Sequence, residues 1–100
     1  MTMEGIASLS LCEEASRIIR LLAGASRWIL LSHTKPDGDT LGCGSALWSS
    51  GRSLGKDVVW GGPDPVPESY MFLAGTGSFL PGVPLGSLSP DRDTVVVALD

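Results

Sequence analysis

Three short apolar runs, spaced along an otherwise polar and glycine-containing chain, constrain the fold most strongly. They lie at residues 28–31, 58–60 and 94–99, and the last contains three consecutive valines. Runs of this length, rich in β-branched and aromatic residues, are typical of strands covered on both faces of a sheet. Helix-forming segments alternate with them. We therefore predict an α/β fold, a Rossmann-like parallel sheet with flanking helices, in which the valine run takes a central position.

The first helix is predicted at residues 11–23. Apolar side chains recur there at i, i+3, i+4 and i+7, which is the pattern of an amphipathic helix. Ser10 and Glu13 have the spacing of a capping box at its start, and Gly24 is a typical stop signal at its end.

A second helix is predicted at residues 41–54, and its first turns are unusually rich in glycine, serine and alanine. Small side chains let a helix backbone approach a sheet or a ligand closely. Further along, a short helix is predicted at 68–74. Residues 75–93 are rich in glycine and proline and are predicted to be mostly loop, with a short edge strand at 79–80.

The segment at residues 34–39 joins the first strand to the second helix and contains the sequence Pro-Asp-Gly-Asp. It is predicted to be a turn, because Pro36 presets φ and Gly38 permits a positive φ. Functional groups of an open parallel sheet gather where strands end, so His33, Asp37 and Asp39 are candidates for chemistry.

Asp100 follows the last strand and would share this edge of the sheet with His33, Asp37 and Asp39. Carboxylates so close together repel one another unless a cation neutralises them. Imidazole with carboxylates suits Mn²⁺, Fe²⁺, Zn²⁺ or Mg²⁺. These four side chains are therefore predicted metal ligands.

The same residues have a purely structural interpretation. Pro-Asp-Gly is an ordinary turn signal, and either Asp37 or Asp39 could accept backbone N–H bonds and cap the second helix. Asp100 taken alone is a polar residue at the end of a strand. The spacing by itself leaves both interpretations open.

Charge and motifs exclude several classes of function. Seven Lys and Arg against eleven Asp and Glu give a net charge of −4, which argues against a non-specific clamp on long nucleic acid. No apolar run approaches the roughly 20 residues of a membrane span, and no signal-peptide pattern is found, so we expect a cytoplasmic protein without a membrane partner. Dinucleotide, P-loop and nucleophile-elbow motifs are not found.

Residues 33–42, His-Thr-Lys-Pro-Asp-Gly-Asp-Thr-Leu-Gly, resemble the first motif of the DHH phosphoesterases, the RecJ-like family, whose pattern is H-x-x-P-D-G-D-x-L-G-S. The resemblance is closest to the branch of oligoribonucleases (nanoRNases) that also remove the 3′-phosphate of 3′-phosphoadenosine 5′-phosphate. The Pro-Glu and Phe-Leu pairs within residues 67–73 and the apolar strand ending at Asp100 support it. Cys43 stands where the family commonly has Ser.

This resemblance implies a Mn²⁺-dependent phosphodiesterase or phosphatase with two metal ions, for which Mg²⁺ or Co²⁺ are substitutes. His33 and Asp37 would hold one ion, Asp39 the second, and Asp100 would bridge them, with Asp37 and Asp39 as the catalytic pair. The implied substrates are short oligoribonucleotides or a nucleotide 3′-phosphate. The alternatives are a cyclic-dinucleotide phosphodiesterase or pyrophosphatase of the same superfamily, and a non-catalytic α/β binding module.

The Asp-His-His motif that names the family, and its C-terminal substrate-binding domain, are not found in residues 1–100. We therefore expect residues 1–100 to be the N-terminal part of a DHH domain in a longer parent protein, and to be inactive or nearly so alone. An incomplete sheet that exposes the strand at 95–99 would favour association, so a homo-oligomer is a further expectation.

Overall fold

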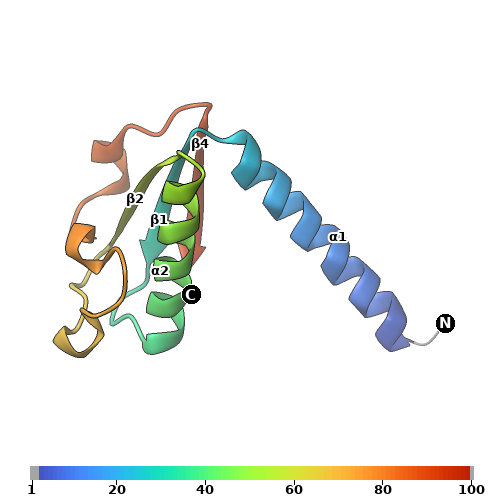
Figure 1. Cartoon of the computed structure of the whole chain (residues 1–100), viewed down its shortest axis with the longest axis horizontal. Helices are drawn as coiled ribbons and strands as arrows, with labels where there is room; N and C mark the ends of the chain where they lie inside the picture. Colours follow the sequence, from blue (N-terminus) through green and yellow to red (C-terminus); the bar gives the residue numbers. More distant parts are fainter. Residues whose placement is uncertain (1–2, 100) are drawn as a thin grey trace.

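The computed structural model describes residues 3–99 of the chain (Figure 1). Short 3₁₀ turns interrupt the long connection that precedes the last strand. In chain order the elements are α1 (Met3–Gly24), β1 (Arg27–Ser32), α2 (Gly38–Ser53), β2 (Asp57–Gly62), η1 (Glu68–Tyr70), η2 (Thr76–Ser78), β3 (Leu80–Pro81), η3 (Leu85–Leu88) and β4 (Thr94–Leu99).

The four strands form one parallel sheet in the order β3-β2-β1-β4, which confirms the predicted α/β class. In its register Leu30 of β1 lies between Trp60 of β2 and Val97 of β4. The chain builds β2 and β3 on one side of β1 and then returns to place β4 on the other side. The crevice outside the carboxyl ends of β1 and β4 is therefore the topological switch point, where open α/β sheets bind ligands.

The core lies between α2 and one face of the sheet. Leu30, Leu41 and Trp60 are at most 1% exposed, and Trp60 packs edge-on against Phe79. Close approach of α2 requires glycine at Gly44, because a Cβ there would lie 2.5 Å from a ring carbon of Trp60. The small residues of α2 predicted that this helix packs closely against the sheet, and the structure confirms it.

Helix α1 begins at Met3, eight residues before its predicted start, so Ser10 and Glu13 lie inside the helix and the predicted capping box is wrong. The helix points away from the sheet (Figure 1), and its Ile18 and Ile19 are more than half exposed. No helix within residues 3–99 combines the length and apolar character needed to cross a membrane.

Two further predictions need correction. The helix predicted at 68–74 is only the 3₁₀ turn η1, because the chain turns again and reaches Gly75 with a φ of 88°. Within the described residues, β4 lies at an edge of the sheet and β1 takes the central position. Val96 of β4 is accordingly 42% exposed, whereas its register partner Ile29 on β1 is fully buried. The predicted short edge strand is present one residue later, at Leu80–Pro81.

Candidate functional site

The loop from β1 to α2 turns at Lys35 rather than at the predicted Gly38. Lys35 has a φ of 51°, in the left-handed region, whereas Gly38 is already the first residue of α2. The backbone N–H of Lys35 donates a hydrogen bond of 2.8 Å to Oδ2 of Asp64, which follows β2. This bond offsets the cost of the left-handed conformation and ties the loop to the neighbouring strand end.

Gly38 makes room for an aromatic side chain. A Cβ at this position would lie 3.1 Å from the hydroxyl oxygen of Tyr70 and 3.3 Å from its ring. The phenol of Tyr70 therefore stands beside the loop at the point between Asp37 and Asp39. The sequence interpretation missed Tyr70. Its position between the Pro-Glu and Phe-Leu pairs of residues 67–73 was the one hint in the sequence.

Asp37 is the N-cap of α2. Its Oδ1 accepts hydrogen bonds from the backbone N–H of Thr40 at 2.9 Å and from the hydroxyl of Thr40 at 3.0 Å. The pKa of Asp37 is lowered chiefly by the backbone N–H of Thr40, then by its hydroxyl, with a smaller contribution from the charge of His33. The capping interpretation is thus confirmed for this residue. Both bonds end on Oδ1, so neither engages Oδ2.

Asp39 lies in the first turn of α2, where a negative charge interacts favourably with the helix dipole. It lines a hollow of about 240 Å³ together with Thr40, Cys43, Ala98 and Leu99. Two of these residues end β4, and the others begin α2. The hollow therefore occupies the switch point between β1 and β4.

His33 directly follows β1, and its orientation is set by its neighbour. Its Nδ1 lies 2.6 Å from the carbonyl oxygen of Thr34. Because a carbonyl only accepts hydrogen bonds, Nδ1 carries a proton and donates it to Thr34, so Nε2 is the ring nitrogen left for another partner. A ring nitrogen that donates to a backbone carbonyl while the other is left for a metal is the usual arrangement of metal-binding histidines.

The predicted ligands do not form a complete metal site within the described part of the chain. Among residues 3–99, no three His, Cys, Asp or Glu side chains gather closely enough to hold an ion. The fourth predicted ligand, Asp100, lies outside the described residues. The available donors, an imidazole nitrogen and carboxylate oxygens, suit divalent metals individually, but their present geometry does not bring them onto one ion.

The acidic residues at the other end of the sheet have structural partners. Asp57, at the start of β2, lies 3.4 Å from the guanidinium of Arg27. Asp91 accepts from the hydroxyl of Thr94 and from the backbone N–H of Asp93. Asp57 and Asp91 therefore have structural partners of their own and do not belong to the candidate site at residues 33–39.

Comparison with protein-family models, with curated proteins and with solved structures gave no match for this chain.

Proposed function

We propose that this chain carries the metal- and phosphate-binding edge of a phosphoesterase of the DHH type. The proposed substrates are short oligoribonucleotides or the 3′-phosphate of 3′-phosphoadenosine 5′-phosphate. The motif at residues 33–42 supports the family, and the parallel sheet is compatible with it.

One observation carries the proposal. The hollow at the switch point brings Asp39, from the motif, beside Ala98 and Leu99, the residues that lead to Asp100. The two segments are about sixty positions apart in the sequence, and only a parallel β1–β4 pair places both at one edge. Ligand-binding groups of open α/β sheets occupy this place.

In the proposed site the ligands are His33 through Nε2, Asp37 through Oδ2, Asp39 and Asp100. The Thr34 carbonyl orients the imidazole, and the Thr40 hydrogen bonds hold the Asp37 carboxylate at the start of α2. Oδ2 of Asp37 is left for an ion by these bonds, and the exposed side chain of Asp39 can rotate toward one. When bound, a pair of divalent metal ions supplies a hydroxide nucleophile and neutralises the attacked phosphate.

Tyr70 adds a phenol hydroxyl beside Gly38 of the loop. In the proposed enzyme this phenol donates a hydrogen bond to a phosphate oxygen, which the net charge of −4 would otherwise repel. Cyclic dinucleotides and pyrophosphate remain alternative substrates, because the resemblance places the substrate-selecting residues beyond residue 100.

A second candidate function is a non-catalytic α/β binding module. The observation that favours it is the N-cap of α2, since Asp37 has a structural task that needs no metal. The two candidates differ in whether the loop binds a divalent ion.

Paramagnetic Mn²⁺ tests the proposal, because it broadens the NMR signals of nearby amides. In a Mn²⁺ titration at neutral pH we expect the signals of residues 33–43 and 98–99 to broaden first. Asp39→Asn should weaken this effect at least several-fold. Asp93→Asn is the matched control, because this exposed carboxylate lies before β4 at the opposite edge.

The corresponding activity assay uses the parent protein with a short oligoribonucleotide and Mn²⁺. We expect Asp39→Asn to abolish hydrolysis and Asp93→Asn to retain it. Broadening that starts elsewhere, or full hydrolysis by the Asp39→Asn variant, would refute the phosphoesterase assignment. No metal-dependent broadening at all would favour the binding module.

A further inference from the structure

The outer edge of β4 presents backbone groups that no other strand in the described part of the chain pairs with. On its inner side β4 pairs in parallel with β1, and the N–H of Arg27 donates to the carbonyl of Asp93, directly before β4. Successive residues of a strand direct their N–H and C=O groups to opposite sides, so Asp93 and every second residue after it face β1. Thr94, Val96 and Ala98 therefore direct theirs to the open edge.

Most of these backbone groups are available to another strand. The N–H of Thr94 is used locally, because it donates to the carbonyl of Asp91 in the turn before β4. The C=O of Thr94 and both groups of Val96 and Ala98 face no strand among residues 3–99. An occupant of this edge must therefore be extended and must supply backbone donors and acceptors, as an added strand does.

The two edges of the sheet differ in how they are protected. At one edge, β3 has only two residues and one of them is Pro81, and both features discourage the addition of another strand. At the other edge, β4 has six residues, Thr-Val-Val-Val-Ala-Leu, with no charge and no proline. Uncharged β-branched side chains lie opposite their own copies without repulsion. The edge at β4 is thus suited to pairing with itself.

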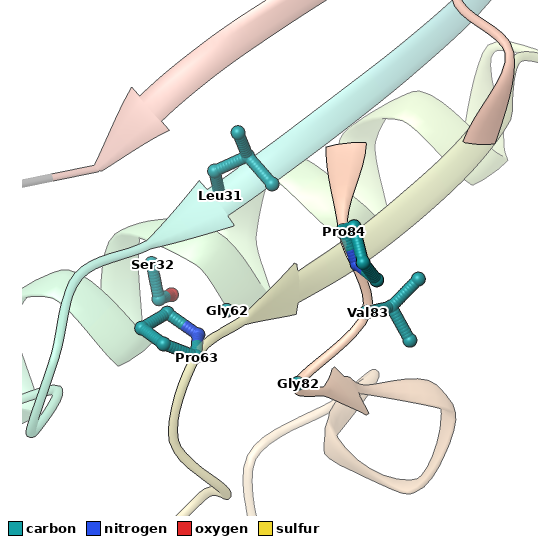
Figure 2. A pocket seen from close by; sticks show the side chains of 7 residues that line it. All are labelled: Leu31, Ser32, Gly62, Pro63, Gly82, Val83 and Pro84. Atoms are coloured by element: carbon teal, nitrogen blue, oxygen red, sulfur yellow. The ribbon is translucent and has the colours of Figure 1, made fainter. Parts of the chain in front are cut away.

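The face of the sheet opposite α2 is covered along β1 and open along β4. After β3 the chain passes Leu31, where residues 83–84 line a second hollow of about 400 Å³ (Figure 2). It then reaches the start of β1, where the guanidinium of Arg27 donates to the carbonyl of Leu88. This connection follows β1 and accounts for the burial of Ile29, whose register partner on β4 is 42% exposed. The connection leaves the outer edge of β4 accessible.

We propose that two copies of this chain pair through β4, in antiparallel orientation about a two-fold axis, to form one continuous sheet. The axis places Val96 opposite Val96, and each donates to and accepts from the other. The N–H of Ala98 in each copy donates to the free carbonyl of Thr94 in the other. This pairing goes beyond the proposed function and does not depend on it.

The expected affinity is low, because a pair of six-residue strands buries far less surface than the roughly 1,600 Å² of a standard interface. We expect a dissociation constant of about 0.1–1 mM. A strand of another protein, or of a longer parent, is the competing occupant of this edge. Either of them would leave the 100-residue chain monomeric.

Sedimentation velocity between about 10 μM and about 1 mM protein tests the pairing. We expect the average mass to rise from the 10.4 kDa of one chain toward twice that value. Val96→Pro removes an N–H that faces the open edge, where a strand tolerates proline, and should weaken association at least ten-fold. Val96→Thr is the matched control. It keeps the N–H and the β-branched shape, so it should associate like the unmodified chain.

Hydrogen exchange at both ends of this concentration range locates the contact. We expect the amides of Val96 and Ala98 to exchange slowly at the high concentration only. The amides of Val95 and Val97 face β1 and should exchange slowly at both concentrations. In a mixture of labelled and unlabelled chains, a nuclear Overhauser effect should join Hα of Val95 in one copy to Hα of Val97 in the other, because these residues lie opposite each other in the proposed register.

A chain that stays monomeric at the high concentration, or a dimer in which Val96 and Ala98 exchange rapidly, would overturn the proposal. Equal association of Val96→Pro and Val96→Thr would overturn it as well. If Val96→Pro does not fold, the exchange of Val96 and Ala98 in the unmodified chain still decides the matter. The proposed function is tested separately, by Mn²⁺ binding at residues 33–43.

Discussion

At the scale of single residues, Asp37 combines a structural role with its proposed chemical one. Its Oδ1 caps α2 through Thr40, and this hydrogen bonding is the main cause of its lowered pKa. The structural and the functional interpretations of the loop therefore concern different oxygens of one carboxylate. Replacement by asparagine separates them, because asparagine caps helices as well as aspartate does but carries no charge.

For Asp37→Ala without metal we expect a fall of several degrees in the melting temperature at pH 7, because the cap is lost. The folded-state pKa lies below the ordinary value of 3.8, so the ionised carboxylate stabilises the fold above that pH. This stabilisation is lost as the pH falls through the lowered pKa. Thermal unfolding followed by circular dichroism should therefore show the difference from the unmodified chain shrinking below about pH 4.

Asp37→Asn is the control for that experiment. It should stay close to the unmodified chain in melting temperature at pH 7 and yet weaken Mn²⁺ binding. An Asp37→Ala variant as stable as the unmodified chain at pH 7 would show that the cap contributes nothing.

At the scale of elements, α2 is built to lie close to the sheet at particular positions. Gly44 and Gly51 face Trp60 and Val58, and a Cβ at either would come within 2.5 Å of those side chains. Gly42 has no neighbouring atom within 4 Å of such a Cβ. Gly42 and Gly44 are only two residues apart, yet the packing of α2 requires glycine at Gly44 and not at Gly42.

Gly44→Ala should lower the free energy of unfolding by about 1–3 kcal/mol, because the indole of Trp60 must shift within a packed core. Gly42→Ala should raise it by about 0.5–1 kcal/mol, because alanine favours the helix and meets open space. Urea unfolding of both variants measures the two changes in the free energy of unfolding. A destabilising effect of equal size at both positions would contradict the packing described for α2.

At the scale of the whole molecule, the sheet and α2 form the packed body, and α1 extends from it (Figure 1). The indole N–H of Trp28 donates to the carbonyl of Leu22, and Lys56 donates to the carbonyl of Ala23, so these bonds tie the C-terminal end of α1 to the sheet. The side chains of residues 13–20 are exposed. Local stability should therefore differ strongly between these parts.

Hydrogen exchange should show this difference. We expect the amides of β1, which is paired on both sides and holds the fully buried Ile29 and Leu30, to exchange last. The amides of residues 13–20 should exchange about a hundred-fold faster, because the carbonyls and side chains around them are solvated.

Strong protection of residues 13–20 would instead mean that the exposed apolar side chains of α1 are covered. Repeating the exchange at much lower protein concentration would then identify self-association through α1 if the protection disappeared.

The sequence by itself determined the strands, the parallel α/β class and the loop that carries His33, Asp37 and Asp39, because periodicity and turn chemistry are local properties. It placed the start of α1 and the position of β4 wrongly. A helix start depends on competing local signals, and a strand's place in the sheet depends on distant partners.

Only the tertiary structure decided what lies beside the loop. Tyr70 reaches Gly38, Asp64 holds Lys35, and the ends of β4 and β3 complete the two hollows. Each of these contacts joins residues about thirty or more positions apart, and no local pattern encodes them. They follow from the order β3-β2-β1-β4, because parallel strands in that order bring the segments after each of them to a single edge.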